Sequence, residues 1–211
     1  MKEIIINHHK IGNTHPIFII AEAGINHNGS LTLAKKMVDI AKRAGVSCIK
    51  FQTHIADKEM IKTNIRPGKI SKKTLWSIIK NCELSETEEL KLQKYCKKKK
   101  ILFLSTPFSI EAVHRLEKLK IPAYKIGSGE LTNPPFLETV AKTGKPIILS
   151  TGMSTISEIK SAVKILKKYK NSFALLQTTS TYPSDYSEIK LGMIKKLQHM
   201  FNVPVGLSDH S

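Results

Sequence analysis

The chain has 211 residues, of which 41% are apolar and 24% are charged, a composition typical of one large soluble α/β domain. No apolar run approaches the roughly 20 residues that cross a membrane, and the N-terminus lacks the apolar centre of a signal peptide, so we expect a cytoplasmic protein with no membrane partner. The net charge of +17 comes mainly from lysines without interleaved aromatic residues, which argues against nucleic-acid binding, and three unpaired cysteines fit a reducing compartment.

Residues 1–16 are predicted to form an N-terminal β-hairpin. An isoleucine run at residues 4–6 and the single Ile11 flank His8, His9 and Lys10, and Pro16 ends the pattern. We expect this hairpin to close the bottom of a barrel. Its two histidines are expected to be loop residues, because no acidic or cysteine partner is near in sequence.

Seven short apolar runs, each ending in polar residues, then organise the chain. They are residues 17–22, 48–52, 101–106, 124–130, 147–151, 173–178 and 203–210. Alternation of these strands with helix-like stretches predicts a parallel sheet with right-handed crossovers. The glycine-rich phosphate fingerprints of doubly wound folds are absent, which favours a barrel. We therefore predict a (β/α)8 TIM barrel over residues 17–211, truncated after the seventh strand.

Helices are predicted between the strands. Ser30 is expected to cap a helix over residues 31–43, with Leu33, Met37, Ile40 and Ala44 on its apolar face. Capping-box patterns start two more helices, at Ser85 with Glu88 and at Thr155 with Glu158. The last helix is expected over residues 187–200.

Residues 54–84 form one long insertion, with a short helix expected over residues 72–80. Insertions of this length in compact domains are usually functional or mobile. In a barrel this one would lie over the C-terminal ends of the strands, where such folds place their sites.

Two lysines, Lys50 and Lys125, lie inside otherwise apolar strands. Burying a lysine is costly unless it meets an anion. One such residue would favour a structural ion pair. Two, each near the C-terminal end of its strand, indicate an anionic ligand such as a phosphate or carboxylate.

Hydroxyl, carboxyl and amide groups follow several strands. Ser128 and Ser150 lie beside glycines whose backbone amides could hold phosphate oxygens, although such segments are more often simple turns. Carboxylates at strand ends could position sugar hydroxyls, move protons or form ion pairs. His210 is a candidate metal ligand or acid–base group, and His27 is a second candidate that could instead stabilise its loop. The strand-end carboxylates and neutral polar groups are Glu22, Glu130, Gln52, Thr106 and Tyr182.

These motifs together resemble the sialic acid (N-acetylneuraminate) synthase family, bacterial type, in order over nearly the whole chain. The motifs are residues 21–29, 49–52, 105–108, 123–130, 148–153, 179–183 and 206–210. The resemblance implies a (β/α)8 barrel followed by an antifreeze-like C-terminal domain, which is absent from this sequence. It also implies condensation of phosphoenolpyruvate with an N-acetylated hexose, N-acetylmannosamine being typical, with release of phosphate.

The resemblance also implies a role for each strand-end residue. Lys50, Lys125, Ser128, Ser150, Ser180 and Ser208 would bind phosphoenolpyruvate, although asparagine stands at the place of Ser180 in some bacterial members. Gln52, Thr106, Glu130 and Tyr182 would bind the amino sugar. Catalysis would involve Glu22, Lys50, Lys125 and Glu130, with Glu22 near the reacting centre. His210 would bind a divalent metal, with manganese expected and magnesium or cobalt as alternatives, in a homodimer of the full-length protein.

Several alternatives stay open. Legionaminic and pseudaminic acid synthases share the same barrel motifs and differ in the groups around the sugar. A further alternative is that the chain is no enzyme but a non-catalytic barrel fragment that binds phosphoenolpyruvate. Since a second metal histidine and the last strand would lie beyond Ser211, we expect this chain by itself to have little or no synthase activity.

Overall fold

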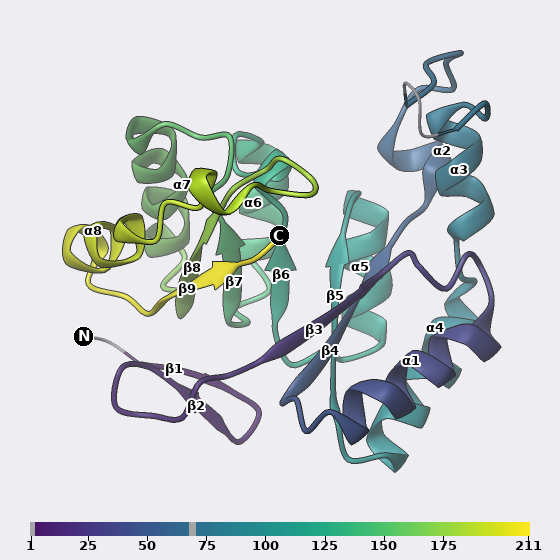
Figure 1. Cartoon of the computed structure of the whole chain (residues 1–211), viewed down its shortest axis with the longest axis horizontal. Coiled ribbons are helices and arrows are strands. Elements are labelled where there is room, and N and C mark those ends of the chain that lie inside the picture. Colours follow the sequence, from purple (N-terminus) through teal and green to yellow (C-terminus); the bar gives the residue numbers. More distant parts are fainter. Residues whose placement is uncertain (1–2, 68–70) are drawn as a thin grey trace. The chain divides into compact units, whose positions relative to one another are not determined.

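The computed structural model describes residues 3–67 and 71–211, and the polypeptide divides into two compact units. The N-terminal unit comprises residues 18–121. The C-terminal unit comprises residues 122–211 together with the start of the chain up to residue 17. Each unit contains a parallel sheet with helices in the crossovers (Figure 1), which confirms the α/β class with parallel sheets.

The N-terminal unit is built on a three-stranded parallel sheet in the order β3-β4-β5. Its strands are β3 (Ile20–Gly24), β4 (Cys48–Thr53) and β5 (Leu102–Pro107). Its helices are α1 (Leu31–Arg43), α2 (Ala56–Glu59), α3 (Leu75–Cys82), α4 (Glu86–Lys98) and α5 (Ile110–Lys118). The register places Glu22 beside Lys50 within the strands and Gln52 beside Thr106 near their C-terminal ends.

The C-terminal unit is built on a four-stranded parallel sheet in the order β6-β7-β8-β9. Its strands are β6 (Tyr124–Ile126), β7 (Ile147–Ser150), β8 (Phe173–Thr178) and β9 (Val205–Ser208). Its helices are the short 3₁₀ turns η1 (Ser128–Glu130) and η2 (Tyr186–Glu188), and α6 (Pro134–Ala141), α7 (Ile156–Lys168) and α8 (Gly192–Phe201). Ser208 lies beside Thr178 at the strand ends.

The start of the chain forms the expected antiparallel hairpin, β1 (Ile4–Ile6) with β2 (His9–Ile11). The turn is shorter than predicted. Ile6 pairs with His9, so Asn7 and His8 alone make the turn, and His9 belongs to a strand. Asn7 has φ 57°, a left-handed conformation that asparagine tolerates in two-residue hairpin turns.

Apolar strand residues form the core of each sheet. Ile49 and Phe51 on β4, and Ile126 and Ile147 on β6 and β7, are at most 2% exposed. The three cysteines are free and buried, as expected for small apolar residues in a core. Within residues 3–67 and 71–211, no helix combines the length and the apolar character that a membrane crossing requires.

The predicted apolar face of α1 was wrong although its bounds and its Ser30 cap were right. Leu33 and Ile40 are 41% and 56% exposed, whereas α1 buries Ala34, Val38 and Ala41. Those three residues also follow a helical period, and the small alanines let the helix approach its neighbours closely. The larger side chains are therefore left on the outer face.

Three other boundaries differ from the predictions. Strand β3 begins and ends later than expected, so Glu22 lies within it. The helix of the insertion is shifted to α3, where Thr74 caps the first turn. The last predicted helix is interrupted, because Asp185 caps the short turn η2 and α8 begins only at Gly192. Both capping boxes, at Ser85 and Thr155, are confirmed.

Candidate functional site

Glu22 and Lys50 form an ion pair between the adjacent strands β3 and β4 of the N-terminal unit. Lys50 is only 8% exposed, and Glu22 is more open to solvent. The parallel register sets the two residues side by side, so the pair follows directly from the strand alignment. A carboxylate and an ammonium in contact can bind a polar ligand or pass a proton between ligand atoms.

Gln52 and Thr106, the two predicted sugar-binding residues of this unit, are register partners on β4 and β5. Thr106 is buried and Gln52 is half-buried. The amide oxygen of Gln52 lies 3.0 Å from Nε2 of His54, whose Nδ1 lies 2.8 Å from Glu59. The sequence singled out neither His54 nor Glu59, although a histidine two residues beyond Gln52 was a visible signal.

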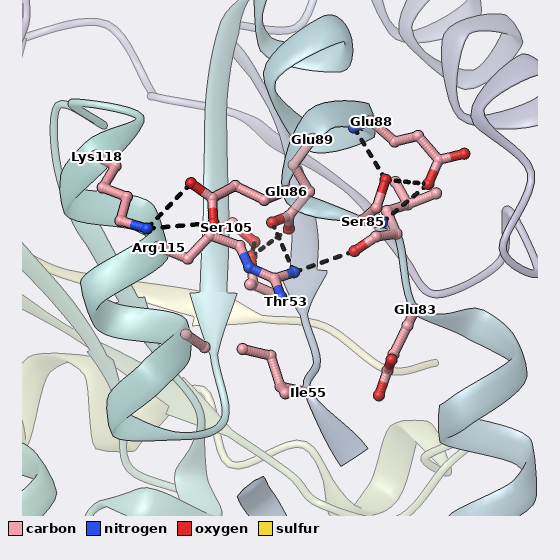
Figure 2. Close-up of polar contacts among 12 residues, drawn as sticks. Thr53, Ile55, Glu83, Ser85, Glu86, Glu88, Glu89, Ser105, Arg115 and Lys118 are labelled. Atoms are coloured by element: carbon pink, nitrogen blue, oxygen red, sulfur yellow. Dashed lines mark hydrogen bonds and ion pairs between the residues drawn. The ribbon is translucent and has the colours of Figure 1, made fainter. Parts of the chain in front are cut away.

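A second buried polar cluster anchors the ends of β4 and β5 (Figure 2). Thr53 donates a hydrogen bond to Glu89 of α4 at 2.7 Å, and its hydroxyl lies 2.7 Å from that of Ser105. Arg115 of α5 donates to Glu89 at 3.3 Å and to the carbonyl of Leu84 at 3.1 Å. Burial raises the pKa of Glu89, while the hydrogen bond from Thr53 and the charge of Arg115 oppose that rise.

This cluster was also missed from the sequence. Glu89 shares the buried face of α4 with Leu92 and Cys96. A carboxylate on an apolar helix face is the signal that could have found it, since an isolated buried charge is costly. The cluster fixes Thr53, the neighbour of Gln52, and thereby helps to hold the strand end that carries the predicted sugar contact.

His27 follows β3 and is 1% exposed. Its Nδ1 accepts a hydrogen bond from the backbone of Gly29 at 3.2 Å, and burial lowers its pKa. These contacts support the loop-stabilising alternative for this residue.

Lys125 is the buried lysine of the C-terminal unit, on β6 and 5% exposed. Its Nζ donates to the hydroxyl of Ser150 at 2.7 Å and to the carbonyl of Ile126 at 2.8 Å. Loss of solvent around the ammonium lowers the pKa of Lys125 to about 7. An anion beside this amine would restore the charged form, so the position is suited to a phosphate or carboxylate ligand.

Three serine hydroxyl groups, each at or just after the end of a different strand, lie near Gly152 or near the residues beside it. Gly152 donates its backbone N–H to Ser128 at 3.0 Å. A Cβ at this position would collide with the hydroxyl oxygens of Ser180 and Ser128 as they stand, so the glycine lets both hydroxyls approach the backbone. Ser150 lies two residues earlier, against Lys125. The unit thus brings together one amine and the hydroxyls of Ser128, Ser150 and Ser180.

The other predicted residues of this unit lie around the same strand ends. Glu130 accepts a hydrogen bond at 2.8 Å from Asn133, which also caps α6. Tyr182 is 80% exposed, with its ring 5.0 Å from that of His210. The hydroxyl of Ser208 lies 3.4 Å from Nε2 of His210. Nδ1 of His210 is buried and makes no hydrogen bond with the described part of the chain.

His210 was predicted to bind a metal. Among residues 3–67 and 71–211, no group of three or more His, Cys, Asp or Glu side chains gathers in a way that could hold a metal ion. The unpartnered Nδ1 leaves one ring nitrogen available, but one histidine does not make a metal site. The described residues therefore do not fit a complete divalent-metal centre.

The sequence and structure of this chain are similar to those of known synthases. Residues 37–211 match the NeuB family. An uncharacterised protein of Methanocaldococcus jannaschii is 44% identical over 212 residues, which cover 100% of this chain and 60% of that protein. The N,N'-diacetyllegionaminic acid synthase of Campylobacter jejuni is 40% identical, with 92% of this chain and 60% of that protein covered. Human N-acetylneuraminate-9-phosphate synthase is 35% identical, with coverages of 95% and 57%.

Solved structures give the same picture. The N-acetylneuraminic acid synthetase of Leptospira borgpetersenii superposes with a TM-score of 0.90 at 38% identity, covering 100% of this chain and 70% of that one. A truncated 3-deoxy-D-arabino-heptulosonate 7-phosphate synthase of Thermotoga maritima shares the fold, with a TM-score of 0.72 at 14% identity. The present chain spans about 60% of the length of the curated relatives named above.

Proposed function

The chain belongs to the NeuB family, and from that premise we propose that its protein condenses phosphoenolpyruvate with an N-acylated amino sugar, giving a sialic-acid-type sugar and phosphate. Relatives named as sialic, legionaminic and pseudaminic acid synthases support this reaction class. A (β/α)8 barrel is the proposed fold of the protein that contains this chain. The observation that carries the proposal is the buried amine of Lys125 beside the hydroxyl cluster at Gly152.

Phosphoenolpyruvate is proposed to bind through Lys125 and the hydroxyls of Ser128, Ser150 and Ser180. A buried ammonium and preoriented hydroxyls stabilise an anion more strongly than water does, because they need no reorganisation. The glycine at position 152 supports this role, since the missing side chain lets the hydroxyls of Ser128 and Ser180 lie against the backbone. Lys50 and Ser208 are proposed as further contacts to the same ligand.

The proposed reaction forms one carbon–carbon bond and breaks one carbon–oxygen bond. The methylene carbon of phosphoenolpyruvate attacks the aldehyde carbon of the open-chain sugar, whose oxygen takes up a proton. Water adds to C2 of the former phosphoenolpyruvate and loses a proton, which leaves a hydroxyl on C2. The bond from C2 to the phosphate oxygen then breaks, the hydroxyl proton passes to the departing phosphate, and a ketone remains at C2. The Glu22–Lys50 pair is proposed to supply and accept these protons, since an acid and a base are already in contact there.

The amino sugar is proposed to contact Gln52, Thr106, Glu130 and Tyr182. N-acetylmannosamine is the proposed sugar, with the precursors of legionaminic and pseudaminic acids as alternatives. The identities of 40% and 35% to a legionaminic and a sialic acid phosphate synthase are too close to separate these substrates. His210 stays a predicted ligand of manganese, and no step is assigned to a metal because the described residues form no complete site.

The test is phosphate release by the natural protein that contains this chain. Phosphoenolpyruvate is supplied with manganese and, in separate reactions, N-acetylmannosamine, its 6-phosphate or a diacetamido hexose. We expect phosphate release that depends on one of these sugars, with a matching new keto acid. Binding of phosphoenolpyruvate by calorimetry without turnover of any sugar would instead favour the non-catalytic reading.

A further inference from the structure

Gln52, a proposed sugar contact, lies next to the buried side chain of His54, which in turn contacts the buried side chain of Glu59. His54 and Glu59 are 5% and 4% exposed at their side chains. His54 directly follows β4, and Glu59 ends the short helix α2 in the insertion. The inference below rests on the proposed role of Gln52 and concerns how its amide is oriented.

Glu59 and His54 form a tight contact. Nδ1 of His54 lies 2.8 and 3.0 Å from the two carboxylate oxygens of Glu59, and the backbone N–H of Ile55 also donates to Glu59 at 3.3 Å. The imidazole stacks on Phe108, with ring centroids 4.3 Å apart and an angle of 16° between planes. Since a carboxylate only accepts hydrogen bonds, Nδ1 carries a proton and the ring orientation is fixed.

The other ring nitrogen sets the amide of Gln52. Nε2 of His54 lies 3.0 Å from Oε1 of Gln52. An amide oxygen accepts hydrogen bonds and cannot donate them, so this contact requires a proton on Nε2. Both ring nitrogens of His54 thus act as donors in this arrangement, Nδ1 toward Glu59 and Nε2 toward Gln52. The oxygen of Gln52 is then occupied, and its NH₂ group is left to face the ligand.

The NH₂ group of Gln52 lies near Gly24 of the neighbouring strand. Gly24 of β3 has φ +52°, which side chains rarely adopt. A Cβ there would lie 3.8 Å from Nε2 of Gln52 and 3.3 Å from a carboxylate oxygen of Glu22. The donors of Gln52 thus lie on the same side as the Glu22–Lys50 pair.

We propose that Glu59 and His54 are positioning residues that hold Gln52 as a hydrogen-bond donor, so that the sugar must present an acceptor oxygen to it. Gln52 touches the sugar, whereas His54 and Glu59 act through it. A sugar that presents only a hydrogen-bond donor at this point would place that donor against the NH₂ group of Gln52, which is also a donor, and would bind poorly. The insertion thereby contributes to substrate selection without contacting the substrate.

The kinetic test uses the natural protein with its sugar, in variants that separate orientation from folding. His54→Phe keeps the stacked ring and removes both N–H groups, and His54→Gln restores a donor toward Gln52. We expect His54→Phe to raise KM for the sugar roughly tenfold, with KM for phosphoenolpyruvate and kcat changed less than twofold, and His54→Gln to recover part of the loss. His114→Gln, on the exposed face of α5, is the matched control and should change nothing.

A second pair of variants tests the direction of the amide. Gln52→Glu places a second acceptor where the NH₂ group stood, so it should weaken sugar binding at least as much as Gln52→Ala. Near-normal sugar binding by Gln52→Glu would overturn the proposal. It would also be overturned if His54→Phe and His54→Gln raised the KM for the sugar and the KM for phosphoenolpyruvate to the same extent and lowered the midpoint of thermal unfolding equally.

A last measurement is independent of catalysis. Nitrogen-15 spectra of the unliganded protein, with the His54 signals assigned by their loss in His54→Gln, should show a proton on both ring nitrogens. An unprotonated Nε2 would overturn the proposal even in an active enzyme. If no sugar releases phosphate and both protons are present, the proposed function fails while the orientation of Gln52 stands.

Discussion

Both units bury a lysine on a parallel strand, and the two ammonium groups contact different partners. Lys50 in the N-terminal unit is paired with the carboxylate of Glu22. Lys125 in the C-terminal unit contacts a hydroxyl and a carbonyl, and burial lowers its pKa to about 7. The pair is already neutral as a unit, whereas the amine of Lys125 gains most from an arriving anion. The same residue type is thus proposed to support proton transfer in one unit and anion binding in the other.

The largest expected effect is on how stability depends on pH in the C-terminal unit. In the unfolded chain Lys125 keeps its proton up to the ordinary value of 10.5, but in the folded chain it loses it near 7. The unfolded state therefore binds more protons between these values, and the free energy of unfolding should rise with pH across them, by up to about 5 kcal/mol. Below pH 7 the burial penalty is present in full.

Chemical denaturation at pH 6.5, 8 and 9.5 measures this rise. Lys125→Met should lack it, so the difference between the two proteins isolates the residue from all other titrating groups. Lys50→Met should keep the rise. Parallel pH curves for the natural protein and Lys125→Met would show that the amine is not desolvated.

The next effect concerns anion binding. Lys125→Met should lower kcat/KM for phosphoenolpyruvate by about 10²–10³-fold, the usual cost of removing one preoriented charge-stabilising donor. Steady-state phosphate release with varied phosphoenolpyruvate measures it. Lys160→Met, on the exposed side of α7, is the control for loss of one positive charge. An equal loss in the control would mean that overall charge alone attracts the ligand.

A third effect concerns the N-terminal unit, where the buried charges lie in ion pairs, in contrast to Lys125. Arg115→Met would leave Glu89, 3% exposed, without its cation and should lower the free energy of unfolding by about 2–4 kcal/mol. Arg115→Met/Glu89→Gln should recover much of this loss, because the amide carries no charge. Urea unfolding at pH 7 measures both, and no recovery in the double variant would contradict the account.

The smallest effect should be the same in both units. Lys120 follows α5 and Lys170 follows α7, and both adopt left-handed backbone angles, φ 53° and 59°. Glycine has no Cβ to strain in this conformation, so Lys120→Gly and Lys170→Gly should each stabilise the protein by about 0.5–1 kcal/mol. Gly144→Ala, at φ +72° after α6, should destabilise by a similar amount. Thermal unfolding of the three variants tests this.

These helix ends show which local signals can be read in a sequence. Glycine just past a helix is a readable signal, and Gly45 after α1 and Gly144 after α6 both have positive φ. The lysines that end other helices in the same conformation carry no such signal. Capping boxes at Ser85 and Thr155 were predicted correctly because their partners lie three residues apart, within one helical turn.

The candidate site was predictable in its residue types and not in its contacts. The alternation of strand and helix, together with polar residues after each strand, determined the fold class and named Lys50, Lys125 and the strand-end serines. Only the tertiary structure decided that Lys50 meets Glu22 while Lys125 meets Ser150, and that Gly152 fits against Ser128 and Ser180. It also revealed that the carboxylate of Glu59 contacts His54. Pairing, burial and pKa depend on groups brought close from distant parts of the chain, whereas periodicity and caps depend on near neighbours in sequence.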